Sequence, residues 1–312
     1  MTIAHRTVKL LDGKLIPALG WGNASSGLLG GGQKSIDAAK LAIASGITHI
    51  DTAQLYRTET ETGVAVRESG AEGKVWVTTK LSEKEGIADA NGVNRDALRK
   101  SVEGSLQRLG AKPDLLLIHN IEAAAGHIAP LWTALEDLVF DGTLAGVSIG
   151  VSNYRPQDIE AVVAVARIIP AVNQFEFHPY LLAHTEGLIA LQKKHGIATE
   201  AYGPLTPLLR HPTGGPLKPV LERIAKTHNI DPATVLLLWV IAKGHVAISG
   251  SAKADNLKKL AAIDQLPDLT AEEVAEIDAV GRKIHFRGYK VHHVKDFPAP
   301  DLPEDLPAEG KL

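Results

Sequence analysis

The chain contains no cysteine, which excludes disulfide bonds and thiolate chemistry. It also lacks runs of like charge: 33 Lys and Arg stand against 36 Asp and Glu, a formal net charge of −3. Nothing in this balance indicates nucleic acid or a membrane surface as a partner. No apolar stretch approaches the roughly 20 residues that cross a bilayer, and residues 1–9 lack the apolar core of a secretory signal. We therefore expect a cytoplasmic protein.

What is present is a repeating order of short apolar strands and amphipathic helices. A hairpin is predicted over residues 8–17, around the turn dipeptide Asp12-Gly13. Helices are predicted over residues 34–45, 59–69, 94–109, 130–140 and 156–168, with further ones closed by Gly196, capped by Asp231 and opened by Thr270. Strands are predicted over residues 16–22, 47–50, 75–81, 115–120, 145–153, 171–177, 197–202 and 246–251.

Strands that alternate with helices at this rate imply a parallel sheet, and eight such units imply closure. The 312 residues fit two domains or one large barrel, but no linker or change of composition divides them. We therefore predict an α/β fold, a single (β/α)8 TIM barrel over residues 1–312 with an N-terminal β-hairpin. Residues 296–312, rich in Pro, Asp and Glu, form a predicted C-terminal loop or tail that docks across the barrel or is partly disordered.

The stretch from residue 46 to 56 carries the first chemical signal. Asp51 stands where a short strand should end, and Tyr56 follows in the next loop. An acid and a phenol so placed suit proton transfer. The plainer interpretation is that Asp51 caps the next helix and Tyr56 packs against it.

Other strands also end in polar residues, and in a parallel barrel these ends meet at one mouth. Each has a structural explanation: Lys80 as a surface lysine, His119 as a core histidine, Ser152 and Asn153 as helix caps. Convergence of the whole set is better explained by function. The set is Asp51, Lys80, His119, Ser152, Asn153, Gln174 and Tyr202.

Four of these side chains form a coherent acid catalyst. A free tyrosine has a pKa near 10, and we expect the Lys80 ammonium to lower the pKa of Tyr56. Asp51 can hold Lys80 charged, and His119 can donate a hydrogen bond to a developing oxyanion. Ser152, Asn153 and Gln174 can hold a carboxamide, with the Tyr202 ring stacked beneath a nicotinamide.

This constellation resembles the aldo-keto reductase family from the hairpin to about Ile284. The most specific segments are GITHIDTAQLY (46–56), VTTK (77–80), LLIH (116–119), GVSN (150–153), VNQFEFHP (172–179) and AYGP (201–204). The resemblance implies reduction of an aldehyde or ketone by NAD(P)H in a barrel without a Rossmann motif. NADPH is the expected cofactor, with NADH as a second.

The resemblance also implies residue roles. The catalytic tetrad matches Asp51, Tyr56, Lys80 and His119, with Tyr56 as general acid. The expected cofactor-binding residues are Ser152, Asn153, Gln174, Tyr202, Gly203, Leu205, Ser249, Gly250, Ser251 and Asn256. No metal site is expected.

Four departures from the family pattern bear on specificity. Asn120 follows the histidine where the family often has Trp, and Gly22-Asn23-Ala24 replaces a pocket aromatic, although Trp21 is near. These changes predict a more polar pocket and a short polar aldehyde or sugar as substrate. At the adenosine phosphate, Gly250 and Asn256 replace the usual Lys and Arg.

Some signals and functions stay open. His292-His293 lacks further ligands at metal spacing. Residues 205–219 are a candidate lid over the cofactor or an ordinary surface loop. The alternatives to a reductase are a redox-sensing, channel-subunit-like barrel and an aldolase or lyase that uses Lys80 as a Schiff base.

Overall fold

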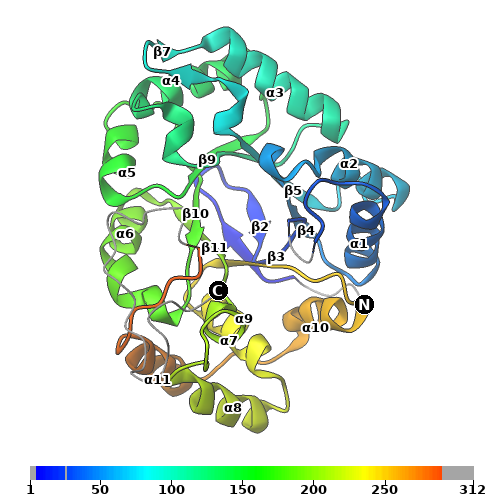
Figure 1. Ribbon diagram of the computed structural model, residues 1–312, viewed down its shortest axis with the longest axis vertical. Helices are drawn as coiled ribbons and strands as arrows, with labels where there is room; N and C mark the ends of the chain where they lie inside the picture. The colour runs from blue at the N-terminus through cyan, green and yellow to red at the C-terminus, as the bar shows by residue number, and fades with distance from the viewer. Residues whose placement is uncertain (1–4, 25–26, 290–312) are drawn as a thin grey trace.

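The computed structural model describes residues 5–24 and 27–289. Within them, eight parallel strands pair in a ring that closes where β12 pairs with β3 (Figure 1). In ring order the strands are β3 (Leu19–Gly22), β4 (His49–Asp51), β5 (Trp76–Leu81), β8 (Leu115–Ile118), β9 (Ser148–Ser152), β10 (Val172–Glu176), β11 (Ala198–Tyr202) and β12 (Val246–Ser249). The predicted (β/α)8 barrel is confirmed.

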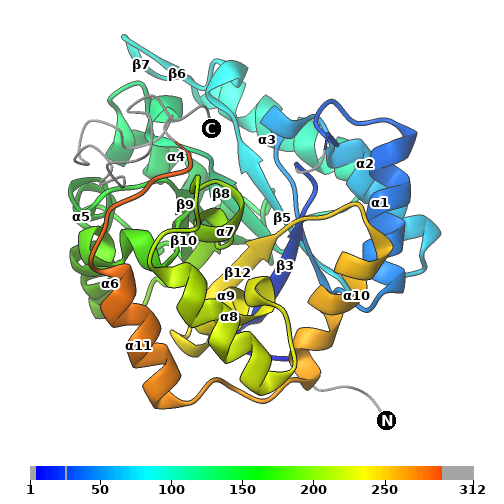
Figure 2. The same cartoon turned by 60° about the horizontal axis from the view of Figure 1, so that its bottom comes forward.

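Helices surround this ring on its outside (Figures 1 and 2). The α-helices are α1 (Gln33–Ala44), α2 (Glu59–Glu68), α3 (Arg95–Leu109), α4 (Ile128–Phe140), α5 (Pro156–Val163), α6 (Leu182–His195), α7 (Thr206–Leu209), α8 (Leu217–His228), α9 (Pro232–Ala242), α10 (Ala254–Ala262) and α11 (Ala271–Gly281). Short 3-10 turns are η1 (Gln54–Tyr56), η2 (Glu83–Glu85), η3 (Ile121–Ala124), η4 (Pro179–Leu181) and η5 (Ile263–Gln265).

Predicted caps fix several helix ends. The side chains of Asn94 and Asp231 accept hydrogen bonds from backbone N–H groups in the first turns of α3 and α9. Thr270 and Glu273 form a reciprocal capping box at α11. These predictions are confirmed.

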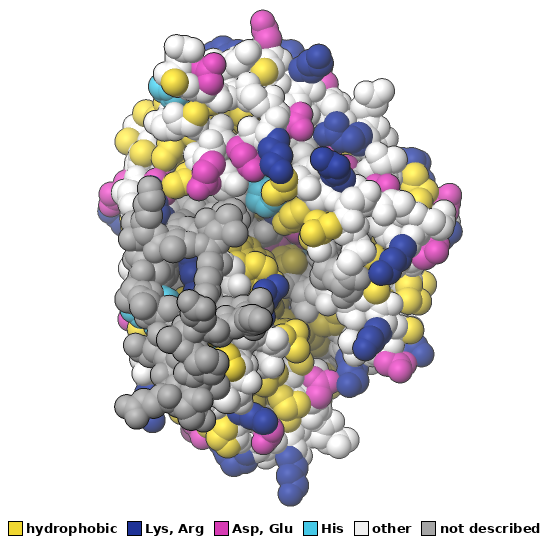
Figure 3. All heavy atoms as spheres, in the orientation of Figure 1, with side chains coloured by type: hydrophobic (Ala, Val, Ile, Leu, Met, Phe, Trp, Pro, Cys, Tyr) yellow, Lys and Arg dark blue, Asp and Glu magenta, His cyan; other side chains and the backbone are white. Residues whose placement is uncertain are grey.

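The predicted hairpin closes the amino-terminal end of the barrel. Strands β1 (Thr7–Lys9) and β2 (Leu15–Pro17) pair antiparallel, and Leu10 and Ile16 pack in one buried cluster with the first residues of β8, β10 and β12. The hairpin is seen through the ring in Figure 1, so that view looks onto the opposite, carboxyl-terminal face. Figure 3 shows the same face hollowed near its centre.

Two sequence-based assignments are wrong in detail. Residues 16–22 are two strands, because the chain leaves the hairpin after Pro17 and Ala18 donates its N–H back to Arg6 before β3 begins. Residues 205–219 are not all loop, since α7 occupies part of the segment and α8 begins at Leu217. The buried side chains of α8, spaced as Leu217, Leu221 and Ile224, form a helical stripe that the loop assignment overlooked. A small hairpin, β6 (Ala88–Asp89) and β7 (Gly92–Val93), was also not predicted.

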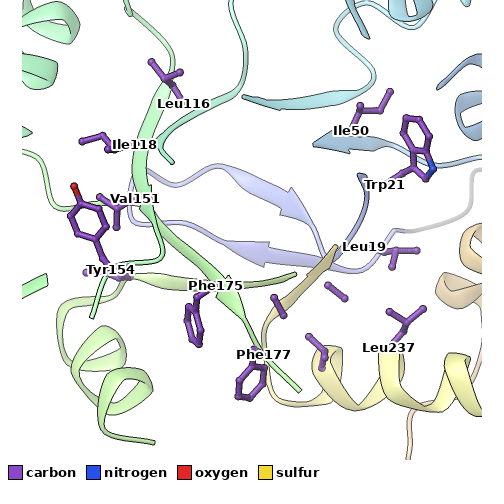
Figure 4. Packing of buried hydrophobic residues seen from close by; sticks show 14 of the residues in the cluster. Leu19, Trp21, Ile50, Leu116, Ile118, Val151, Tyr154, Phe175, Phe177 and Leu237 are labelled. Atoms are coloured by element: carbon purple, nitrogen blue, oxygen red, sulfur yellow. The ribbon is translucent and has the colours of Figure 1, made fainter. Parts of the chain in front are cut away.

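The main hydrophobic core lies between the strands and the helices (Figure 4). Phe177, just beyond β10, stacks on Trp239 of α9 with ring centroids 5.3 Å apart. This packing anchors the strands from outside, so the polar side chains at the mouth are carried by a rigid frame. Within the described part of the chain, no helix is both long and apolar enough to cross a bilayer. The predicted tail, 296–312, lies outside the described residues.

Candidate active site at the carboxyl ends of the strands

Lys80 is the centre of the polar cluster. It points inward from β5 with none of its side chain exposed. Its Nζ lies 2.6 Å from Asp51 Oδ1, 3.0 Å from the Thr52 carbonyl oxygen and 3.3 Å from the Tyr56 hydroxyl. A buried ammonium requires such partners. The interpretation of Lys80 as a surface residue is therefore wrong.

The partners of Lys80 also keep it charged. Burial acts to lower the pKa of Lys80, but the Asp51 carboxylate and the Tyr56 hydroxyl act the other way, and the net pKa lies above its ordinary value. Asp51 does not cap a helix, because its two oxygens bond Lys80 and Gln174 while Thr58 stands at the N-cap of α2. The plainer interpretation of Asp51 is therefore also wrong.

Tyr56 is positioned by the short η1 turn that follows β4. The turn ends at Arg57 with φ 56°, and the Tyr56 carbonyl accepts the N–H of Gly30. The phenol packs edge-on to His119, and its oxygen lies 3.5 Å from His119 Nε2. The four predicted catalytic residues thus meet at one point, with the phenolic oxygen between an ammonium and an imidazole.

The expected net lowering of the Tyr56 pKa is wrong. Burial raises the pKa of Tyr56 more than the Lys80 ammonium lowers it, and Asp51 adds to the rise. Lys80 lowers the pKa of Tyr56, as predicted, but its effect is smaller than that of burial. Tyr56 therefore holds its proton at neutral pH, as a donor must.

The residues predicted to bind a carboxamide lie beside the tetrad. Ser152 ends β9, and its hydroxyl donates to the Gln174 carbonyl oxygen at 2.9 Å. Asn153, held at φ 59°, donates to the His119 carbonyl oxygen at 3.0 Å and accepts the Tyr202 hydroxyl at 2.8 Å. Burial raises the pKa of Tyr202 well above 10, so this hydroxyl stays a donor. The structure brings all four predicted residues together.

The orientation of the Gln174 amide was not predicted from the sequence. Its amide nitrogen donates inward, to Asp51 Oδ2 at 2.8 Å and to Glu200 Oε2 at 3.0 Å. Glu200, in β11, was not predicted as a site residue. The available signal was a single charged residue inside the short strand Ala198–Tyr202.

These groups fit a nicotinamide carboxamide, which has one acceptor oxygen and one donor NH2. The Gln174 amide oxygen makes no hydrogen bond within the described residues. It is therefore available to accept from the NH2. The nearest donors to a carboxamide oxygen are the Asn153 amide and the Ser152 hydroxyl. Their hydrogens are engaged with His119, Ser152 and Gln174 oxygens, so one of these hydrogen bonds must be exchanged when the carboxamide binds.

The predicted adenosine end lies after β12 and carries little charge. The Ser251 hydroxyl accepts from Asn256 Nδ2 at 3.1 Å and from the Lys253 backbone N–H at 3.2 Å. Ser249 and Gly250 are partly exposed, and Asn256 is exposed at the first turn of α10. Lys259 is engaged by Asp231 at 3.0 Å, whereas Lys253 and Lys258 are exposed.

Gly203 and Leu205 begin the loop that leads to α7. A Cβ on Gly203, at φ 62°, would come within 2.7 Å of the Tyr289 ring. This glycine therefore permits close approach of the C-terminal segment to the loop after β11.

That C-terminal segment was not predicted as part of the mouth. Buried Glu176, the last residue of β10, accepts the backbone N–H groups of Gly288 and Tyr289 at 2.8 and 3.1 Å. Its Oε2 lies 3.8 Å from Arg287 Nε. Tyr289 is thereby held edge-on to Tyr202, with ring centroids 5.2 Å apart. A buried glutamate at a strand end was the available signal, but its partner lies more than a hundred residues away.

The aromatic residues near β3 do not line the mouth. Trp21 is fully buried, and its indole N–H donates to the Ser251 carbonyl oxygen at 2.9 Å. Asn23 is buried between Thr62 and Ser35. Asn120 accepts the N–H of Ala123 and so begins η3.

No group of three or more His, Asp or Glu side chains suited to hold a metal occurs among residues 5–24 and 27–289. His292-His293 lies outside these ranges.

Comparison with known proteins identifies the family of the chain. Residues 29–282 match the model of the Aldo/keto reductase family. A Schizosaccharomyces pombe protein named "NAD/NADP-dependent indole-3-acetaldehyde reductase" is 30% identical over 82% of this chain and 87% of its own length. A Mycolicibacterium vanbaalenii aldo-keto reductase is 35% identical over 90% of this chain and 94% of its own.

A solved structure supports the same assignment. The crystal structure of an aldo/keto reductase from Brucella melitensis superposes with a TM-score of 0.76 at 31% identity, covering 89% of this chain and 100% of that one. The chain therefore belongs to the aldo/keto reductase family, NAD(P)-dependent oxidoreductases that act on small-molecule carbonyl compounds.

Proposed function

We propose that the protein reduces an aldehyde or ketone to an alcohol, with NADPH or NADH as hydride donor and Tyr56 as general acid. The observation that carries this proposal is the contact of one buried ammonium, Lys80 Nζ, with both Asp51 and the Tyr56 hydroxyl. The cofactor supplies the hydride to the carbonyl carbon, and the residues of the chain manage the oxygen.

Tyr56 donates its proton to the carbonyl oxygen as negative charge develops there. The phenolate that remains lies beside Lys80 Nζ, at 3.3 Å, and the attraction lowers the energy of the charged product state. Asp51 holds this ammonium in place and charged. His119 Nε2, 3.5 Å from the phenolic oxygen, contacts the same carbonyl oxygen and orients it.

Ser152, Asn153 and Gln174 would hold the nicotinamide carboxamide, and Tyr202, Gly203 and Leu205 would bind the same end of the cofactor from the strand β11 and the loop after it. Ser249, Gly250, Ser251 and Asn256 would contact the adenosine half. Because Gly250 and Asn256 offer no charge to a 2′-phosphate, we expect only a modest preference for NADPH. The two-cofactor name of the fission yeast relative is consistent with this expectation.

The substrate is expected to be small and polar, such as a short aldehyde or a sugar. After β3, Trp21 is buried and Asn23 is bonded to Thr62 and Ser35. After β8, Asn120 caps η3 where the family often has Trp. Neither strand end therefore places an aromatic ring at the mouth through these residues.

The aldolase alternative is disfavoured by the state of Lys80. A Schiff-base lysine needs a lowered pKa so that its amine is free, whereas the Lys80 pKa is raised and its nitrogen has three close oxygen partners. The redox-sensing alternative keeps the same site but turns over slowly.

One experiment separates these functions. NADPH and NADH oxidation is followed by absorbance against a panel of simple and polyhydroxylated aldehydes. Multiple turnovers with a defined subset support the reductase. A single turnover per protein favours the redox sensor, and borohydride trapping of substrate on Lys80 without nicotinamide binding favours the aldolase.

A further inference from the structure

A second buried carboxylate lies beneath the catalytic cluster, and the mechanism above does not use it. Glu200 has no exposed surface and sits directly opposite Gln174 in the pairing of β11 with β10. Its Oε2 accepts from Gln174 Nε2 at 3.0 Å, and its Oε1 lies 3.5 Å from His49 Nε2.

Asp51 and Glu200 together determine which way the Gln174 amide faces. An amide nitrogen has two hydrogens, and here each has a carboxyl oxygen as acceptor, at 2.8 and 3.0 Å. A flipped amide would place its oxygen against the Asp51 carboxylate and take from Asp51 Oδ2 and Glu200 Oε2 the N–H donor that each has here. With both acceptors in place, the amide oxygen is turned away from Asp51 and Glu200.

The protonation state of Glu200 beside Asp51 is compatible with accepting a hydrogen bond from Gln174. Burial, followed by the nearby Asp51 charge, raises the pKa of Glu200 to about 8. Glu200 is thus a neutral acid at pH 7 that still offers an acceptor oxygen to Gln174.

We propose that Glu200 is a positioning residue that fixes Gln174 with its amide oxygen toward the mouth, where that oxygen accepts the NH2 of the nicotinamide carboxamide. This inference rests on the proposed function, because it requires a nicotinamide in the site. Glu200 itself touches neither cofactor nor substrate.

The test compares NADH with its 3-acetylpyridine analogue, in which a methyl ketone replaces the carboxamide and no NH2 remains. Binding of each is titrated by tryptophan fluorescence. The variants are Glu200→Leu and Glu200→Met, which fill the volume without an acceptor, and Glu200→Gln, which keeps one. The control is Glu136→Gln: Glu136 is equally buried but lies in α4, paired with Arg167.

We expect wild type, Glu200→Gln and the control to prefer NADH over the analogue by about tenfold, the value of one hydrogen bond. In Glu200→Leu and Glu200→Met the preference should fall below about threefold, mainly through weaker NADH binding. Two apolar substitutions, Glu200→Leu and Glu200→Met, are made so that the test can still be carried out if one of the two variants does not fold.

Two results overturn the inference while leaving the reductase intact. One is an unchanged preference in folded Glu200→Leu or Glu200→Met; the other is an equal loss of affinity for both dinucleotides. Failure of wild type to bind either dinucleotide overturns the proposed function itself, and this inference with it.

Discussion

At the scale of single residues, the site is governed by one buried ammonium. Lys80 is tolerable inside the barrel only because Asp51, Thr52 and Tyr56 surround its nitrogen. The same contacts make it useful, since a charge held in a dry site acts on its neighbours more strongly than in water.

Lys80→Met should therefore lower kcat by at least about 100-fold, the scale of general acid catalysis. Removing the ammonium takes away the largest influence that lowers the pKa of Tyr56, so this pKa should rise further above its ordinary value of 10.0. The readout is the pH profile of kcat. The fall of kcat at alkaline pH should move to higher pH. The variant also leaves the buried Asp51 carboxylate without its cation. Its melting temperature and its cofactor affinity are therefore measured as controls for misfolding. Full activity with an unshifted profile would exclude Lys80 from catalysis.

The sequence predicted the location of site residues that lie at or just after the carboxyl ends of the strands. Asp51, Lys80, His119 and Tyr202 could be placed at one mouth because parallel strands share their carboxyl edge. Glu200 and Glu176 could not be assigned, because their partners are set by strand register and by a C-terminal segment far away in sequence. The net pKa of Tyr56 also needed the structure, since burial competes with Lys80 and cannot be read from spacing.

At the scale of elements, the first turn of α10 carries the side chains expected to contact the 2′-phosphate of NADPH. Asn256 is exposed there and bonds only Ser251 Oγ among the described residues. The nearby Lys253 and Lys258 are exposed, and such lysines contribute about 1 kcal/mol or less to a phosphate.

Asn256→Arg should tighten NADPH three- to tenfold, about 0.7–1.4 kcal/mol, and leave NADH within twofold. A guanidinium can bond a phosphate through two N–H groups, and the added charge should steepen the salt dependence of NADPH binding. Fluorescence titrations of both cofactors at two salt concentrations measure this. A wild-type preference for NADPH above about a thousandfold, over 4 kcal/mol, would reveal a phosphate clamp elsewhere in the chain.

The segment before Tyr289 is a second element that acts on the mouth. Glu176 accepts the backbone N–H groups of Gly288 and Tyr289. Burial acts to raise the pKa of Glu176, but the hydrogen bonds from His178 and Gly288 and the nearby charges of His178 and Arg287 outweigh it, so the net pKa is lowered. Tyr289 consequently stands against the ring of Tyr202 and beneath the guanidinium of Arg210. This contact links the C-terminal segment to the proposed nicotinamide platform.

At the scale of the whole molecule, periodicity alone was enough for the barrel. Each barrel strand was found because short, mostly apolar runs alternate with amphipathic helices, and Asn94, Asp231 and Thr270 fixed three helix starts. The errors fell where a chain turns between two sheets, after Pro17, and where α8 follows a Gly-Gly-Pro loop. Local pattern there does not reveal where the next element packs.

Stability should depend on pH through Glu200. Its pKa is about 8 in the folded protein against an ordinary 4.5, so between these values the native state holds a proton that the unfolded state lacks. Stability is therefore lost as pH rises through this window, by up to about 1.4 kcal/mol per pH unit. Glu200→Gln has no such proton, so wild type should weaken relative to it from pH 5 to pH 8. Urea unfolding at several pH values measures the difference; a constant or rising difference contradicts a raised pKa.

The central claim is that the Tyr56 hydroxyl is the proton donor, and Tyr56→Phe tests it most directly because only that hydroxyl is removed. Pre-steady-state and steady-state rates are measured beside cofactor titrations, with Tyr154→Phe, a buried tyrosine outside the cluster, as control. The account predicts cofactor affinity within a few-fold of wild type and a kcat lower by at least about 100-fold. A Tyr56→Phe enzyme that keeps more than about a tenth of the wild-type kcat would show that another group is the acid.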